Sequence, residues 1–334
     1  MVRWLERRQV PLYVAAILAG VTLGLLAPAA GPGLGVAVGP VLGALLYATF
    51  LQVPARELAR SLRAGRFLAA VLVADFVVAP LVVAAMTPFL PADVAVRTGV
   101  LLVLLAPCVD YVVVFTGLAG GSAGRLLAAT PLLLLAQMAL LPLLLGLLLG
   151  PAAAGAIAPG PFVEAFVGYI LLPLGLAWLT QAWAARHRSG EVVAGAATAA
   201  MVPLMVATLL LVVASQVPGL GAVRAVLGAV PFYVVFLLVM VPLGALVARL
   251  FRLGTADARA VAFTGATRNS LVVLPLALAL PAGPVVAATV VAQTLVEVVG
   301  MVVAVRAVPR VVAPLLRGTP GRPAERAPGG PTPG

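Results

Sequence analysis

Seven polar residues that could bind a solute or carry a proton lie within otherwise apolar stretches of the sequence. They are Cys108, Asp110, Arg268, Asn269, Ser270, Gln293 and Glu297. A thiolate is a ligand for soft metal and metalloid centres, and a carboxylate removed from water can carry a proton. Amide and hydroxyl groups hydrogen-bond the oxygen atoms of a small solute. Such groups are costly in apolar surroundings, so each is a candidate for a functional role.

Each candidate also has a purely structural interpretation. A single cysteine usually behaves as a small buried residue, and Glu297 could be a hydrogen-bonded acid inside a helix bundle. Asp110 and Arg268 could form a buried ion pair that holds two segments together, rather than contact a solute. Asp75 lies in another apolar stretch. The sequence leaves open whether its role is that of a second proton site or of a structural acid.

The composition places these residues in a membrane protein. Of 334 residues, 63% are hydrophobic and 9% are charged, and the mean hydropathy is +1.19. A water-soluble domain of this length cannot bury so much apolar surface. Apolar runs of about 20 residues are long enough to cross a hydrocarbon layer of about 30 Å. Because every backbone polar group there must be hydrogen-bonded, the spans are predicted to be helices and the chain an all-α membrane protein.

Apolar runs and their charged or Gly/Pro-rich interruptions predict ten transmembrane helices. The first five are 10–27, 34–53, 67–90, 98–118 and 126–149, and the second five are 162–183, 192–217, 225–248, 260–280 and 285–305. An odd number of helices per half gives the halves, about 10–149 and 162–305, opposite orientations, as in the inverted repeats of many secondary transporters. The transmembrane domain is predicted to cover 1–309. The Pro- and Gly-rich segment 310–334 is predicted to be a disordered cytoplasmic tail.

The basic residues predict the orientation. All 21 are arginines, and the net charge is +11. Eighteen lie at the amino terminus, in alternate loops and in the tail, whereas only Arg97 and Arg224 lie in the remaining loops. Since positive residues stay on the cytoplasmic side, both termini are predicted to be cytoplasmic, and the protein to lie in the plasma membrane. Because the arginine clusters flank apolar spans, they indicate contacts with lipid head groups and not with nucleic acid.

The fourth and ninth predicted helices each contain a break. Residues 105–108 read Leu-Ala-Pro-Cys, and residues 265–270 read Gly-Ala-Thr-Arg-Asn-Ser. Proline removes a helical hydrogen bond, and glycine lowers the cost of unwinding. For a single helix, a simple kink is the common explanation. Breaks at matching positions in both halves predict that helices 4 and 9 cross at the membrane midplane, with half-helix ends directed at a ligand.

These segments resemble the bile acid:sodium symporter superfamily and, within it, the arsenite efflux permeases. The resemblance covers about residues 10–310 and is carried by 105–108, by 263–270 (Phe-Thr-Gly-Ala-Thr-Arg-Asn-Ser) and by 290–301, which contains Gln293 and Glu297. It implies export of trivalent arsenic, with Cys108 as the As(III) ligand and Glu297 as a second residue on which the family relies. A soft thiolate suits a thiophilic centre of this kind.

One departure from the permease pattern lies in the ninth helix. Arsenite permeases typically show Ser-Asn-Asn-aromatic-Glu there, whereas residues 267–271 read Thr-Arg-Asn-Ser-Leu. Asn269 is retained, but Arg268 replaces an amide and the glutamate is absent. Sodium-coupled relatives use Glu and Gln side chains in this region. A fixed guanidinium in low dielectric disfavours a neighbouring sodium ion, so sodium coupling is not expected.

The sequence therefore favours a secondary transporter that exports arsenite or a similar small oxyacid by proton antiport. Cys108 is expected to engage the solute, Arg268, Asn269 and Ser270 to shape the site, and Glu297 to exchange the proton. The alternative is a symporter of organic anions of the bile acid:sodium symporter type, in which Arg268 pairs with the anion. No cofactor is expected. An enzyme is disfavoured because no catalytic grouping is evident, and the one histidine, His187, falls in a predicted loop.

The arginine distribution makes the topology testable. In a Cys108→Ala background, an impermeant thiol reagent added from outside should label Ala153→Cys and Ala282→Cys but not Arg63→Cys, because only the first two sites are predicted to face outward. The labelling is measured on intact cells, and permeabilised cells provide the control for reactivity. The reverse labelling pattern would overturn the predicted orientation.

Overall fold

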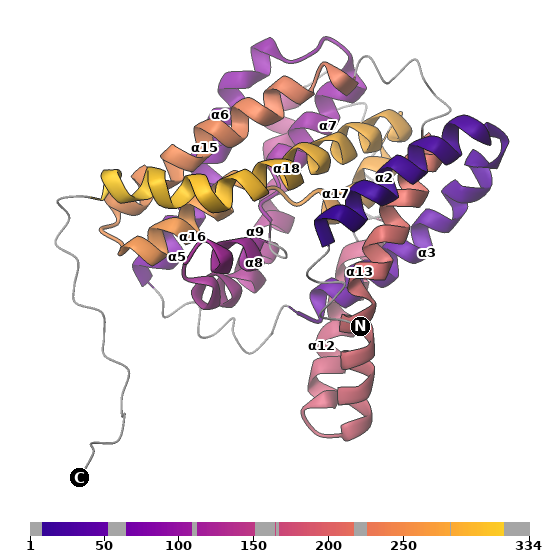
Figure 1. Cartoon of the computed structure of the whole chain (residues 1–334), viewed down its shortest axis with the longest axis horizontal. Coiled ribbons are helices and arrows are strands. Elements are labelled where there is room, and N and C mark those ends of the chain that lie inside the picture. The colour runs from indigo at the N-terminus through magenta and orange to yellow at the C-terminus, as the bar shows by residue number, and fades with distance from the viewer. Residues whose placement is uncertain are drawn as a thin grey trace.

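The computed structural model describes residues 9–52, 65–108, 112–150, 164, 167–216, 226–280 and 282–316. Within these ranges every regular element is a helix, and the β pairing consists of one isolated bridge. The predicted all-helical class is therefore confirmed for the described part of the chain. Figure 1 shows the helices running through a single elongated body.

The described residues of the first half form seven α-helices and three short segments. The α-helices are α2 (Gln9–Leu26), α3 (Gly31–Phe50), α5 (Gly65–Val73), α6 (Ala79–Met86), α7 (Val94–Leu104), α8 (Val112–Leu118) and α9 (Ala123–Leu149). The short segments are the 3-10 turns η1 (Pro28–Ala30) and η4 (Thr87–Phe89) and the π-helical turn η3 (Ala74–Val78), which joins α5 to α6.

In the second half, the residues that the structure describes form six α-helices and one π-helical turn. These are η5 (Val167–Leu171), α12 (Leu172–Ala184), α13 (Arg188–Gln216), α15 (Val230–Leu250), α16 (Thr255–Ala266), α17 (Ser270–Ala279) and α18 (Gly283–Leu315). The last helix passes Pro309 and Pro314 and so includes the first residues of the predicted tail. A proline inside a helix removes its own N–H donor and crowds the carbonyl four residues earlier. In this stretch the side chain of Arg310 donates to the carbonyl of Arg306 at 3.0 Å.

Within the described ranges, six helical segments are long and apolar enough to cross a membrane. They are Gly33–Phe50, Gly65–Phe89, Ala123–Leu149, Arg188–Ser215, Val230–Leu250 and Gly283–Leu315. The other predicted spans fall on helices that are shorter, such as α2, or that are divided into two pieces, such as α7 with α8 and α16 with α17. A multi-pass membrane protein is thus supported by the helices themselves, whereas the ten-helix inverted repeat stays a prediction.

The helices pack in two groups. One group consists of α2, α3, α12 and α13, and α13 contacts each of the other three. The other group consists of α5 to α9 and α15 to α18, with α18 in contact with α7, α15, α16 and α17. Figure 1 shows the first group on the right and the second on the left and centre. Contacts of α13 with α18 and of α3 with α17 join the two groups.

Glycines set the closest helix contacts in the second group. A Cβ atom added at Gly244 on α15 would lie 2.7 Å from the Cα atom of Ala262 and 3.0 Å from the carbonyl oxygen of Val261, both on α16. A Cβ atom at Gly99 on α7 would lie 2.7 Å from that of Thr289 on α18. Small residues let membrane helices approach closely, so these contacts fix α16 and α18 against their neighbours.

The Gly244 contact yields a stability prediction. Gly244→Ala should destabilise the protein by about 1 to 3 kcal/mol, because the new methyl group meets the backbone of α16, which cannot rotate away. Gly43→Ala on α3 is the matched control: a Cβ atom there meets nothing within 4 Å, so the higher helix propensity of alanine should leave stability equal or raised. Thermal unfolding in detergent measures both. Equal melting temperatures for the two variants would contradict the close contact.

Candidate functional site

The two predicted breaks are present, and they pair with each other. Helix α7 ends at Leu104 and α8 begins at Val112, while Ala266 ends α16 and Ser270 begins α17. Between these ends, residues 107 and 268 form an antiparallel β-bridge. The N–H of residue 269 donates to the carbonyl of residue 106 at 2.7 Å, and the N–H of residue 108 donates to the carbonyl of residue 267 at 3.3 Å. Unwound backbone that no helix satisfies is thus hydrogen-bonded across the crossing.

Arg268 is the central residue of this crossing, and its side chain is fully buried. Its guanidinium donates to the Oδ1 atom of Asp75 at 3.1 Å, the carbonyl of Thr264 at 3.1 Å, the carbonyl of Leu104 at 3.4 Å and the carbonyl of Gly265. The ring centroid of Phe236, on α15, lies 5.1 Å from the guanidinium carbon. A permanent positive charge is therefore enclosed by protein groups that favour it.

The charge partner of Arg268 in the described structure is Asp75, which the sequence had left without an assigned role. Asp75 lies in the π-helical turn η3, is fully buried, and also accepts a hydrogen bond from the hydroxyl of Thr264 at 2.8 Å. The pair predicted from the sequence joined Arg268 to Asp110, which lies outside the described residues. Asp75 and Arg268 are 193 positions apart, so no local spacing could reveal their contact. The sequence indicated a role for Asp75 only through the presence of an acidic residue within a predicted apolar span.

Glu297 contacts the backbone of the crossing. Its Oε2 atom accepts the backbone N–H of Arg268 at 2.8 Å and a hydrogen bond from the side-chain amide of Gln293, one helical turn earlier on α18. The β-bridge uses the amides of residues 269 and 108, so the N–H of Arg268 is available for the carboxylate. Glu297 and Gln293 are both buried. The three predicted site residues Arg268, Gln293 and Glu297 are thus brought together.

Two amide groups at the site have buried atoms with no hydrogen-bond partner in the described part of the chain. Asn269 accepts the N–H of Val272 at 3.1 Å through Oδ1 and so caps α17, but its Nδ2 atom has no partner there. The Oε1 atom of Gln293 likewise has none. Buried polar atoms normally find partners. These two therefore offer one donor and one acceptor to a bound solute.

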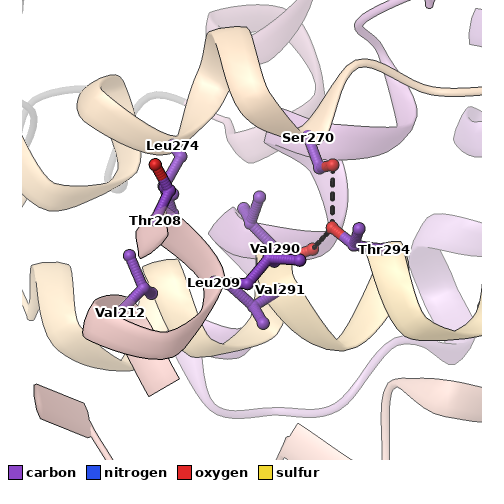
Figure 2. A pocket seen from close by; sticks show the side chains of 8 residues that line it. All are labelled: Thr208, Leu209, Val212, Ser270, Leu274, Val290, Val291 and Thr294. Atoms are coloured by element: carbon purple, nitrogen blue, oxygen red, sulfur yellow. Dashed lines mark hydrogen bonds between the residues drawn. The ribbon is translucent and has the colours of Figure 1, made fainter. Parts of the chain in front are cut away.

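A small cavity lies beside the start of α17, where the two helix groups meet. It measures about 10 Å³ and is lined by Thr208, Leu209, Val212, Ser270, Leu274, Val290, Val291 and Thr294, from α13, α17 and α18. Figure 2 shows Ser270 and Thr294 at one end, joined by a hydrogen bond of 2.7 Å between their hydroxyls. This volume holds about one water molecule. The cavity is therefore too small for a solute larger than water.

Cys108 lies directly after the bridge, with its side chain fully buried. Its position in the break of the first half is the one expected from the sequence. Among the residues that the structure describes, there is no group of three or more His, Cys, Asp and Glu side chains placed to hold a metal ion.

The comparison with protein families matches residues 39–223 to the Sodium Bile acid symporter family. The chain belongs to this family. The match covers more than half of the sequence and runs from α3 to beyond α13. It confirms the superfamily expected from the sequence, whose members are membrane transporters and not enzymes. A comparison with curated proteins gave no match.

The buried ion pair yields a second stability prediction. Asp75→Asn and Arg268→Gln should each lower stability by about 3 to 5 kcal/mol, because either change leaves one buried charge without its partner, and the double variant should lose less than the two single losses together. The control is the exposed pair Arg125 and Asp257, 2.7 Å apart, for which solvent screening limits the effect to about 1 kcal/mol or less. Thermal unfolding of all variants in detergent gives the coupling. Additive losses at positions 75 and 268 would contradict a direct pair.

Proposed function

We propose that the chain is a plasma-membrane secondary transporter that exports arsenite or a similar small hydroxylated solute in exchange for protons. In this proposal ten helices form two inverted repeats with both termini in the cytoplasm, and the paired breaks lie at the membrane midplane. Membership of the Sodium Bile acid symporter family supports transport. The solute is the one that the resemblance to the arsenite efflux permeases implies, and protons are proposed as the coupling ion because of Glu297.

The observation that carries the proposal is the hydrogen bond between the Glu297 carboxylate and the backbone of Arg268, 2.8 Å long. A charged acceptor forms a stronger hydrogen bond than a neutral one. Proton uptake by Glu297 therefore weakens its hold on the break between α16 and α17. The two residues that follow Arg268, Asn269 and Ser270, are among those proposed to contact the solute. One protonation event thus acts on the geometry of the binding residues, which is what an exchanger requires.

The polar groups at the crossing favour an uncharged solute. Arsenous acid is neutral near pH 7 and carries hydroxyl groups that both donate and accept hydrogen bonds. The Nδ2 atom of Asn269 and the Oε1 atom of Gln293 match those two functions. Cys108, the one cysteine of the chain, would supply a single soft ligand, and hydrogen bonds would hold the remaining oxygens of the solute.

The organic-anion alternative needs Arg268 to pair with the substrate. In the structure its guanidinium donates to four protein oxygens and is balanced by the Asp75 carboxylate. An anion would have to displace these contacts and would leave Asp75 buried without its partner, at a large energetic cost. These contacts of the guanidinium therefore favour a structural role for Arg268 over recognition of an anion.

Transport in everted vesicles tests the proposal. An acidic vesicle interior should drive accumulation of arsenite, and collapse of the pH gradient should stop it. Replacement of sodium by potassium in all buffers should leave the rate unchanged. Accumulation of an organic anion, with no accumulation of arsenite, would replace the proposal by the symporter alternative.

Two variants assign the roles within the site. Cys108→Ser should abolish arsenite transport with little change in melting temperature, because it removes the soft ligand and conserves volume. Glu297→Gln should abolish the response to the pH gradient while arsenite still binds, because an amide oxygen can accept the Arg268 N–H but the side chain cannot carry the proton. Transport rates and arsenite-induced thermal shifts are measured on each. Wild-type export by Cys108→Ser would remove Cys108 from the site.

A further inference from the structure

The guanidinium of Arg268 occupies surroundings of the kind that bind a dissolved cation. Its hydrogen-bond acceptors named above are all oxygens, three from backbone carbonyls and one from a carboxylate. Hard cations in proteins are held by carboxylate and backbone carbonyl oxygens. The ring of Phe236 adds an aromatic face, which also attracts positive charge.

The carbonyls come from the ends of two different half-helices. Leu104 is the last residue of α7, and Thr264 and Gly265 lie in the last turn of α16. Carbonyls in the last turn of a helix lack a partner within the helix and carry the negative end of its dipole. The carboxyl-terminal ends of α7 and α16 and the Asp75 carboxylate therefore converge on the guanidinium. Because all three are negative, the crossing requires a positive charge there to be stable.

The way in which the guanidinium reaches both helix ends distinguishes this arrangement from a simple ion pair. Nη1 donates to the end of α7, while Nη2 donates to the end of α16 and to Asp75. The charge thus joins three separate elements, α7, α16 and the turn η3. A simple ion pair would consist only of the contact between the guanidinium and the Asp75 carboxylate.

We propose that the ends of α7 and α16, together with Asp75 and Phe236, form a cation site that the guanidinium of Arg268 occupies as a tethered ligand. The site retains its cation in every transport cycle because the ligand is covalently attached to the chain. The inference concerns what holds the crossing together, and it does not depend on which solute is carried or on proton exchange at Glu297.

Chemical rescue of a truncated variant tests the site. Arg268→Ala removes the guanidinium and leaves its oxygen partners, and it should lower the melting temperature in detergent by about 10 °C. Guanidinium chloride at low millimolar concentration should restore most of this loss with saturation. Urea, which has a similar planar shape but no charge, and choline chloride at the same ionic strength should not. Because the readout is thermal stability, it needs no substrate.

Two further variants serve as controls. Arg259→Ala removes a partly buried arginine whose Nη1 atom also donates to two carbonyls, those of Ala119 and Gly120. No carboxylate pairs with Arg259 in the part of the chain that the structure describes. This variant should therefore show no saturable response to guanidinium. The double variant Asp75→Asn/Arg268→Ala lacks both charges of the site. It should be more stable than Arg268→Ala and insensitive to guanidinium, because an uncharged site no longer requires a cation.

Each result of these measurements either supports the cation site or overturns it. Saturable stabilisation of Arg268→Ala by guanidinium alone supports the site. The proposal is overturned if that variant is as stable as the wild type, if urea stabilises it equally, or if Arg259→Ala responds in the same way. If Arg268→Ala yields no folded protein, the double variant decides: recovery of folded protein supports the site, and equal failure overturns it.

Discussion

Two interrupted helices can lie inside an apolar layer only if their unwound backbones find hydrogen-bond partners. In this protein each break supplies the partner of the other, through the bridge between Pro107 and Arg268. The segments before and after each break are consequently fixed in space: α7 and α8 on one side, α16 and α17 on the other. The pairing also leaves the backbone N–H of Arg268 unused, and that is the group that the Glu297 carboxylate binds.

The crossing contains two buried carboxylates and one buried guanidinium. Asp75 and Arg268 form an ion pair that interacts with helix ends and with the ring of Phe236. Glu297 accepts hydrogen bonds from a backbone N–H and from a side-chain amide. In the proposed exchange, a change of charge on Glu297 would act on the break through the N–H of Arg268, while the contacts of the Asp75–Arg268 pair would keep the helix ends together.

Part of this arrangement could be predicted from the sequence, because apolar length and helix-breaking residues act locally. The breaks near Pro107 and Arg268 lie where residue types predicted them, and the three residues Arg268, Gln293 and Glu297 do meet. The partner of Arg268 could not be predicted, because Asp75 approaches it only through the packing of η3 against α16. The unpartnered atoms of Asn269 and Gln293 depend on side-chain orientation, about which residue spacing carries no information.

The position of a proline in the bridge has a consequence for motion. Proline has no N–H group, and at residue 107 none is needed, because the bridge uses the carbonyl of residue 106 and the N–H of residue 108 on this strand. A shift that paired residue 106 with residue 268 would require residue 107 to donate, which it cannot do. Pro107 therefore opposes sliding of the bridge in that direction, while the two hydrogen bonds still let the strands tilt or twist about each other.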